Sequence, residues 1–240
     1  MNKSKNENQR LNNVSKWYSS RKGLDSRLVL YRARTLLPYF KGSTVLELGC
    51  ADGLMTEMLV SHFKSVVAVD GSAKFCKITR DRIKVDNLEV VCCLFEELKL
   101  NQKFDTIIMA HILEHVEKPN LIISRAKTWL KDGGVILVDV PNADSIHRQA
   151  GVKMGLLKRN NELNELDKKL GHRRVYTLKT LQKDIKKTGL NIKVVGGVFL
   201  KPFTNSQIKK WWSEEMMDAF YELGKEYQEI AAEIYIVCEK

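Results

Sequence analysis

The sequence predicts an α/β protein whose central sheet is mostly parallel. Over residues 43–140, short apolar runs alternate with helix-like segments. Strands that are apolar at nearly every position are buried on both faces, which is typical of a parallel sheet covered by helices. Residues 192–238 then indicate strand, helix and strand, which adds an antiparallel strand. With 240 residues, 44% of them hydrophobic, we expect one domain, residues 1–240.

The individual elements follow from the apolar pattern. Residues 1–14 are polar and are expected to form a disordered or loosely docked arm, and residues 17–40 a helix that ends near Pro38. Thr177 is a good N-cap for a later helix, and Gly189 is a C-cap signal. Strands are expected at residues 43–48, 66–70, 88–94, 104–109, 135–140, 192–200 and 232–238. Helices are expected at residues 54–63, 73–85, 120–130, 177–188 and 206–229.

One long segment breaks the alternation. Residues 142–174 are polar and basic and have no strand periodicity. They follow the fifth strand, on the side where the parallel strands end. Long loops in this position over a rigid sheet usually carry substrate recognition. We therefore expect residues 142–176 to be a substrate-recognition insertion.

The overall composition limits the class of protein. The net charge is +11, and the lysines are spread along the chain, which is typical of a solvated surface; an anionic substrate or nucleic acid would also explain the excess. Cys92, Cys93 and Cys238 lie in apolar runs, and no C-x-x-C pair occurs, so buried reduced thiols are expected rather than zinc ligands. We see no signal peptide and no run of about 20 apolar residues, and we expect a cytoplasmic protein without a membrane partner.

The clearest chemical signal is the loop between the first strand and its helix. Gly49 and Gly53 allow the backbone to approach a ligand closely. The helix that follows offers unpaired N–H groups to a carboxylate or phosphate. A dinucleotide fingerprint would need G-x-G-x-x-G, whereas only two glycines occur here. A pyrophosphate site is therefore the weaker interpretation.

Asp70 ends the second strand, about 20 residues after this loop, where an acid can accept hydrogen bonds from ribose hydroxyls. The alternative is that Asp70 only caps the next helix. The loop and the acid fit the same ligand, so the pair favours the ribose role.

Five segments together resemble class I methyltransferases that depend on S-adenosylmethionine (SAM). They are Glu47-Leu-Gly-Cys-Ala-Asp-Gly53, Val69-Asp-Gly-Ser72, Phe104-Asp-Thr-Ile-Ile-Met-Ala-His111, Leu113-Glu-His-Val116 and Leu130-Lys-Asp-Gly-Gly134. The resemblance covers residues 43–140 closely; the last third fits the family's topology but not its motifs. It implies a Rossmann-like, seven-stranded sheet with the last strand antiparallel. It also implies SAM as cofactor and a helical N-terminal lid within residues 1–40.

The resemblance further implies which residues contact SAM. They are Glu47, Gly49, Cys50, Ala51 and Gly53 at the amino acid end, Asp70 at the ribose, Gly71, Ser72, Phe95 and Glu96 at the adenine, and Ala110 and His111 along the methionine part. Leu94 stands where relatives often have a short acidic residue, which puts the adenine contacts in doubt. His115 would sit near the reactive methyl group, as a catalytic or substrate-contacting residue, with packing of the turn as the alternative. Tyr18, in the expected N-terminal helix, would be a lid residue with a catalytic role or a core residue.

The acceptor is expected to bind a basic turn. Two arginines and a histidine suit a phosphate, phosphonate or carboxylate, and Gly171-His-Arg-Arg-Val-Tyr176 resembles segments of methyltransferases that act on small phosphonate or phosphoramidate compounds. The alternative is a solvated turn with Tyr176 packed inside. No metal is needed for methyl transfer, and no metal-ligand spacing is convincing. The predicted substrate-binding residues are His115, His147, Arg148, His172, Arg173, Arg174 and Tyr176.

These observations leave several functions open. The first is O-methylation of a small anionic metabolite, in its sharpest form a phosphoramidate of a capsule or other surface polysaccharide. The others are N-methylation of a small molecule, methylation of RNA, and SAM binding for regulation without turnover. Trp211 and Trp212 fall in an amphipathic helix and not in a basic strip, which disfavours nucleic acid. Either a monomer or a homodimer is expected; Trp211, Trp212, Met216 and Met217 would supply a dimer contact if they are not core.

Overall fold

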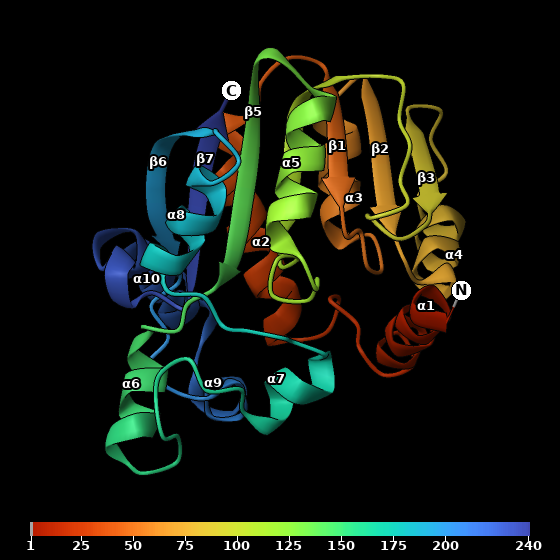
Figure 1. Ribbon diagram of the computed structural model, residues 1–240. Helices are drawn as coiled ribbons and strands as arrows, with labels where there is room; N and C mark the ends of the chain where they lie inside the picture. Colours follow the sequence, from red (N-terminus) through yellow and green to blue (C-terminus); the bar gives the residue numbers. More distant parts are fainter. Residues whose placement is uncertain (1) are drawn as a thin grey trace.

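The sheet has the predicted class and topology. A computed structural model describes the backbone of residues 2–240 and the side chains from Glu7 onward. Its seven strands have the order β3-β2-β1-β4-β5-β7-β6 (Figure 1). The first five strands pair in parallel, and β7 is antiparallel to both β5 and β6. The strands are β1 (Thr44–Leu48), β2 (Ser65–Asp70), β3 (Leu88–Cys92), β4 (Phe104–Ala110), β5 (Leu130–Pro141), β6 (Asn191–Val198) and β7 (Glu233–Glu239).

Helices cover both faces of this sheet, as predicted. They are α1 (Asn2–Val14), α2 (Leu24–Leu36), α3 (Leu54–His62), α4 (Ala73–Arg82), α5 (Pro119–Trp129), α6 (Ile146–Lys153), α7 (Glu165–Leu170), α8 (Leu178–Lys186), α9 (Asn205–Trp211) and α10 (Glu214–Glu226). Short 3₁₀ turns follow α2 and α10. Thr177 caps α8 as expected, since its side chain accepts a hydrogen bond from the Thr180 amide.

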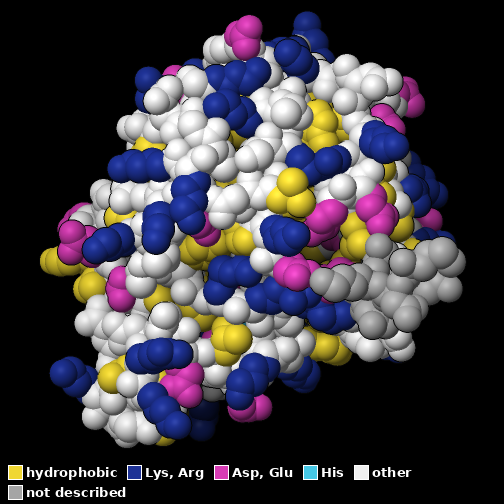
Figure 2. Space-filling model, in the orientation of Figure 1, with side chains coloured by type: hydrophobic (Ala, Val, Ile, Leu, Met, Phe, Trp, Pro, Cys, Tyr) yellow, Lys and Arg dark blue, Asp and Glu magenta, His cyan; other side chains and the backbone are white. Residues whose placement is uncertain are grey.

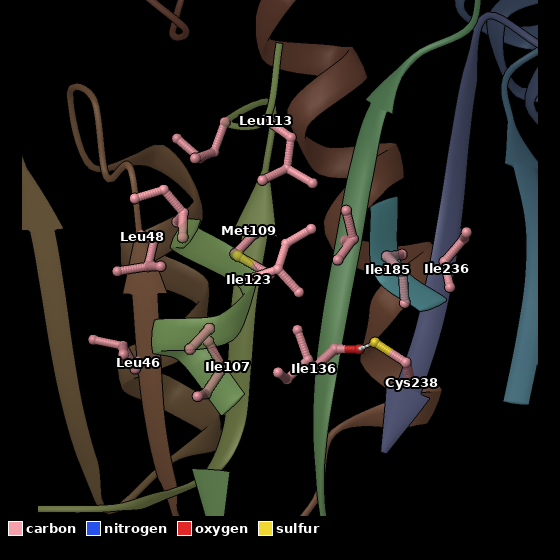
Figure 3. Close-up of a cluster of buried hydrophobic side chains, with 14 of the residues drawn as sticks. Leu46, Leu48, Ile107, Met109, Leu113, Ile123, Ile136, Ile185, Ile236 and Cys238 are labelled. Atoms are coloured by element: carbon pink, nitrogen blue, oxygen red, sulfur yellow. Dashed lines mark hydrogen bonds between the residues drawn. The ribbon is translucent and has the colours of Figure 1, made fainter. Parts of the chain in front are cut away.

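Two apolar clusters lie on opposite faces of the sheet because successive strand side chains point to opposite sides. On one face, Leu46, Ile107 and Ile136 pack with buried residues of α5 and α8 (Figure 3). On the other, Val45 and Ile108 pack with residues of α2, α3 and α10. This double burial explains why the strands are apolar at nearly every position, and it fixes the ends of the strands in space.

Three predicted elements differ from the structure. Residues 2–14 form α1, a helix that packs on α4, so the expected disordered arm is wrong for the described part. Tyr18 lies in the turn between α1 and α2 and not in a helix. The helix expected at residues 206–229 is two helices, because Trp212 is extended and the Ser213 side chain caps α10.

Two surface expectations also change. All five cysteines are free, but Cys92 is exposed and Cys93 is partly exposed, so only part of the expected thiol burial holds. Trp211 is 69% exposed and Met216 is 41% exposed, whereas Met217 is buried in the core. None of the helices within residues 2–240 combines the length and the apolar character that a bilayer span requires.

The carboxyl ends of the parallel strands converge on one edge of the molecule. In Figure 1 the arrowheads of β1, β2 and β5 point to the side where α1, α6 and α7 lie. The order in which strands are added to the sheet reverses at β1 and β4, which are parallel neighbours although two strands separate them in sequence. In open α/β sheets a ligand crevice lies at such a switch point. The fold therefore places the site at this edge, beneath α1 and the insertion.

Candidate active site

A cavity of about 350 Å³ lies at this edge of the sheet. Its floor is formed by the segments that follow β1, β2, β3 and β4, and its cover by α1, the turn at Tyr18, and residues of the insertion. It contains fifteen of the predicted site residues: Tyr18, Glu47, Gly49, Cys50, Ala51, Asp70, Gly71, Phe95, Glu96, Ala110, His111, His115, His147, Arg148 and His172. Gly53, Ser72, Arg173, Arg174 and Tyr176 do not line it.

The loop after β1 has the backbone that its glycines predict. Gly49 has a φ of 89° and Gly53 a φ of 82°, values that side chains rarely tolerate. A Cβ at Gly49 would also collide with Ile112 in the loop after β4. Gly53 begins α3 and lies outside the cavity, so it shapes the loop and does not touch the ligand space.

Two carboxylates face the cavity from the ends of β1 and β2. Asp70 accepts hydrogen bonds from the amides of Ser72, at 2.8 Å, and Ala51, at 3.1 Å. Burial nevertheless raises the pKa of Asp70 to about 6, since those two bonds compensate only in part. Glu47 accepts from the Thr56 hydroxyl at 2.6 Å, and burial raises its pKa to about 8. Neither acid has an ion-pair partner among the described residues, so both have acceptor capacity for a ligand with hydroxyl and ammonium donors.

Of the residues that the family resemblance implies at the adenine, only some line the cavity. Gly71, Phe95 and Glu96 line it, beside Leu94. Ser72 is fully buried, caps α4 through the Phe75 amide and donates to the Asn12 side chain of α1 at 2.9 Å. Its predicted contact with adenine is therefore corrected: Ser72 ties α1 to α4. The two unpaired carboxylates, the glycine loop and this apolar wall together fit SAM.

A buried ionic cluster surrounds His111, which directly follows β4 and has a φ of 55°. Arg32 of α2 lies 2.7 Å from Asp139 and 2.7 Å from Glu233. His111 Nε2 lies 3.3 Å from Asp139 and 3.2 Å from Glu233. Burial and Arg32 act to lower the pKa of His111, but the surrounding carboxylates prevail and raise it to about 9.

The rings of His115, which follows β4, and His172, which follows α7, meet at the cavity. Their ring centroids are 4.7 Å apart and the rings are nearly perpendicular. His115 lies 4.0 Å from the carboxylate of Glu114, and His172 Nδ1 lies 3.1 Å from Asp167. Burial, together with His172 and His111, holds the pKa of His115 well below its usual value. His115 is therefore a neutral imidazole that lines the cavity.

The insertion contributes a partly basic wall. Arg148 is buried and is paired with Asp167 at 3.1 Å, and its Nε donates to the Asn160 carbonyl. Burial and the nearby Lys201 lower the pKa of His147 to about 3. Burial lowers the pKa of Lys201 to about 8, and within residues 2–240 its ammonium contacts an amide, Asn205, without a carboxylate in ion-pair range. Lys201 is thus the more available cation of this wall.

Arg173 and Arg174 have a different role from the predicted one. Arg173 pairs with Glu7 of α1 at 3.0 Å and donates to the His115 carbonyl at 2.8 Å. Arg174 donates to the carbonyls of Leu113, Val116 and Glu117. Their guanidinium groups are thus used within the fold, which corrects their assignment to an anion. Tyr176 is buried and donates to Asp184, so the alternative of a packed tyrosine holds.

Tyr18 lines the cavity without being in a helix. Its ring packs edge-to-face on Phe75 at 6.4 Å. Burial raises the pKa of Tyr18 to about 12, so its hydroxyl stays protonated and can donate but not act as a base near neutral pH.

Sequence reasoning missed Arg10, Arg32, Glu114, Lys201 and Glu233. Glu114 had a local signal, because it lies beside His115 in a recognised segment. The other four come from α1, α2, the segment between β6 and α9, and β7, and they reach the cavity only through the tertiary fold.

The sheet has seven strands in the order given above, with β7 antiparallel. A cavity lies at the β1/β4 switch point, and an acid ends β2. These features define a class I SAM-dependent methyltransferase fold. A model of the methyltransferase domain matches residues 21–194. The chain belongs to this methyltransferase family, whose cofactor is SAM.

Relatives and solved structures agree with this membership. The chain is 26% identical over 175 residues to a mitochondrial ubiquinone biosynthesis O-methyltransferase of Rattus norvegicus, covering 68% of this chain and 48% of the relative. It is 32% identical over 105 residues to a ubiquinone biosynthesis O-methyltransferase of Coxiella burnetii, covering 42% and 45%. The chain thus spans about half the length of these relatives. The N-methyltransferase NodS of Bradyrhizobium japonicum, solved with S-adenosylhomocysteine (SAH), has the same fold, with a TM-score of 0.62 and 15% identity over 99% of this chain and 98% of NodS.

Proposed function

We propose that this protein transfers the methyl group of SAM to an oxygen of a small molecule bound between the strand edge and the insertion. The observation that carries the proposal is one shared cavity: Glu47 and Asp70 face it from the ends of β1 and β2, and His115, His172 and Lys201 line it as well. The names of the relatives support oxygen as the acceptor atom.

The floor of the cavity would hold the cofactor. Asp70 accepts from the ribose hydroxyls, and Glu47 with the backbone at Gly49–Ala51 holds the amino acid end. Phe95 and Glu96 face the adenine, and Ala110 and His111 border the methionine part. SAM supplies an electrophilic methyl group on a sulfonium and leaves as SAH.

The part of the cavity lined by His115, His172 and Lys201 would hold the acceptor. The residues there must keep the acceptor oxygen in line with the methyl carbon, within about 3–3.5 Å. As the bond from that carbon to sulfur breaks and the bond to oxygen forms, the hydroxyl proton must be taken up. His115 positions the oxygen. Lys201 is the proposed proton acceptor, because burial lowers its pKa to about 8 and leaves part of it neutral near neutral pH.

The acceptor is proposed to be a small, acidic molecule. His147 and Lys201 lie on the wall that would meet its anionic part. The hypothesis that the acceptor is a phosphoramidate of a capsule polysaccharide loses its main support, because Arg173 and Arg174 donate to backbone carbonyls of the protein. N-methylation remains the second candidate, supported by the fold alone through NodS.

Methylation of RNA has less support. Lys and Arg side chains are spread over the face seen in Figure 2 and are interleaved with acidic and apolar groups. The cavity is covered by α1 and the insertion, which suits a small molecule better than a polymer.

The test is transfer of labelled methyl from SAM to panels of phenolic, carboxylic and amine acceptors. We expect labelled products from hydroxyl acceptors, with kcat rising as pH increases through about 8, because Lys201 then loses its proton. The Lys201→Met variant should have a low kcat without this rise. Label found only on amines would contradict the proposal and favour N-methylation.

A further inference from the structure

Glu114, His115 and His172 form a cluster that methyl transfer by itself does not explain. One potential ligand atom from each residue lies within 4.8 Å of the others. Glu114 and His115 follow β4, whereas His172 follows α7, so the cluster joins segments nearly 60 residues apart in the chain. We propose that these three side chains bind a divalent metal ion on the acceptor side of the cavity.

The carboxylate of Glu114 is the strongest indication. Its side chain is fully buried, and within the described residues neither of its oxygens receives a hydrogen bond. A buried carboxylate without compensation costs several kcal/mol. His111 Nδ1 lies 3.3 Å from Oε1, but this contact is not a hydrogen bond, and Oε2 has no hydrogen-bond partner among the described residues either. A cation bound between Glu114 and the two histidines would satisfy this carboxylate.

The two histidines are held as metal ligands usually are. The Nδ1 atom of His172 is engaged by Asp167 at 3.1 Å, which leaves Nε2 for a metal. A carboxylate on the second ring nitrogen orients a ligating histidine and increases its basicity. His115 Nε2 lies 4.0 Å from Glu114 Oε1, so this ring nitrogen faces the proposed site.

The arginines of the basic turn preserve this arrangement. The Arg173 amide donates to the Glu114 carbonyl at 2.8 Å, and its side chain donates to the His115 carbonyl. Arg174 NH1 donates to the Leu113 and Val116 carbonyls, at 2.7 and 2.6 Å. These bonds fasten the segment of His172 to the segment of Glu114 and His115. The site is therefore pre-organised by its own backbone, as a metal site requires.

A second cluster in the same cavity makes a poorer metal site. His111, Asp139 and Glu233 also lie close enough to bind one ion. The guanidinium of Arg32 already pairs with both carboxylates, at 2.7 Å each. A metal ion there would meet a guanidinium that keeps its proton, whereas the basic groups beside Glu114 are imidazoles, His111 at 3.3 Å and His115 at 4.0 Å, which can release a proton when a metal binds. The geometry therefore favours the Glu114 cluster.

The donor set indicates the kind of metal. Two imidazoles and one carboxylate suit Zn²⁺, Mn²⁺, Fe²⁺ or Co²⁺, whereas Mg²⁺ and Ca²⁺ prefer oxygen donors only. Three protein ligands leave coordination positions open towards the cavity. If the proposed function holds, the metal would bind the acceptor hydroxyl and lower its pKa, so that its proton leaves more readily. This part rests on the proposed O-methylation; the metal site itself does not. It replaces the expectation from the sequence that no metal is involved.

The experiment measures metal binding without turnover. The full chain is treated with a chelator, dialysed, and titrated with Zn²⁺ by calorimetry and with Co²⁺ by visible absorption, with Mg²⁺ for comparison. We expect one Zn²⁺ or Co²⁺ per chain, with Co²⁺ d–d bands of nitrogen and oxygen ligation, and much weaker binding of Mg²⁺. Glu114→Gln, which keeps the side-chain shape, and His172→Ala should each weaken Zn²⁺ binding by more than about tenfold.

Two controls make the result decisive. His62→Ala removes an exposed histidine of α3 and should bind Zn²⁺ like the wild type. SAH binding by each variant shows that it is folded. Wild-type protein that takes up no ion, or Glu114→Gln and His172→Ala variants that bind as the wild type does, would overturn the metal site. Metal binding without methylation of any hydroxyl acceptor would contradict the proposed function and leave the metal site standing. Methylation of hydroxyl acceptors by a protein that binds no metal would overturn the metal site and leave the proposed function standing.

Discussion

Single side chains at the cavity owe their properties to burial more than to residue type. Asp70 and Glu47 are ordinary acids in the sequence, yet removal from water raises the pKa of both. The opposite happens at His115, where burial and two neighbouring rings keep the imidazole neutral. The sequence indicated where these groups lie along the chain. Their protonation depends on the atoms that surround them in the fold, and a local sequence motif does not show those atoms.

The first prediction concerns the ribose contact. Asp70→Asn should weaken SAH binding by about tenfold or more, because hydrogen bonds to a charged acceptor contribute about 1.5–3 kcal/mol. The pKa of Asp70 in the free protein is about 6, and ribose hydroxyl donors would lower it in the complex. Wild-type affinity should therefore fall as pH drops below about 6, where binding must first remove a proton.

Calorimetry of SAH binding from pH 5 to 8 checks this. The ratio of wild-type to Asp70→Asn affinity should shrink as the pH falls. Asp81→Asn, an exposed acid on α4, serves as the control. A constant ratio over this range would show that Asp70 does not bind the cofactor as a carboxylate.

At the scale of elements, α1 and the insertion form a cover over the cavity. Arg10 of α1 donates to the Gly171 carbonyl at 2.7 Å, and Glu7 pairs with Arg173. On its other side, α1 rests on Gly71 through Leu11 and on Ser72 through Asn12. The polar residues of α1 suggested a disordered arm because they lack a continuous apolar stripe. The helix is instead held by specific contacts with partners distant in the sequence.

The second prediction tests this cover. A Cβ at Gly71 would lie 2.5 Å from Leu11 and 3.0 Å from Leu94, so Gly71→Ala should push α1 away from the sheet edge. Hydrogen exchange of residues 2–14 should become faster, and SAH should dissociate several-fold faster. The double variant Gly71→Ala, Leu11→Ala lacks the Leu11 side chain that the new Cβ would strike, so hydrogen exchange of α1 should become slower again. If Gly71→Ala leaves exchange in α1 unchanged, α1 does not depend on this contact.

At the scale of the whole molecule, one buried ionic network joins the layers. Arg32 belongs to α2, Asp139 to β5 and Glu233 to β7, and all three side chains are less than a tenth exposed. The network lies where the helical layer, the parallel strands and the antiparallel hairpin meet. Removing one partner of a buried pair leaves an uncompensated charge, which is more costly than loss of the contact itself.

The third prediction follows from this position. Arg32→Met should lower the free energy of unfolding by about 3–5 kcal/mol at pH 7.5, because two buried carboxylates lose their cation. Urea denaturation measures the change. Arg34→Met, an exposed arginine of the same helix, should change it by less than about 0.5 kcal/mol. Asp139→Asn added to Arg32→Met should recover part of the loss. Equal effects of Arg32→Met and Arg34→Met would exclude the network as a source of stability.

The sequence by itself determined the sheet and the cofactor side of the site. Continuous apolar runs are possible only in strands buried on both faces, and the positive φ of Gly49 and Gly53 has a direct signature in residue type. Both kinds of information are local, so they can be read along the chain. The position of Asp70 at the end of β2 follows from the same strand pattern.

Only the tertiary structure decided what surrounds His115 and the basic turn at Arg173 and Arg174. Arg173 and Arg174 have the residue types of an anion site, but free carbonyls of a loop nearly 60 residues away take up their donors. Glu114 had no role predicted from the sequence, and only the fold brought His172 beside it and left its carboxylate buried. The physical reason is that a polar side chain binds the partners that folding places within reach, and those partners come from distant parts of the chain.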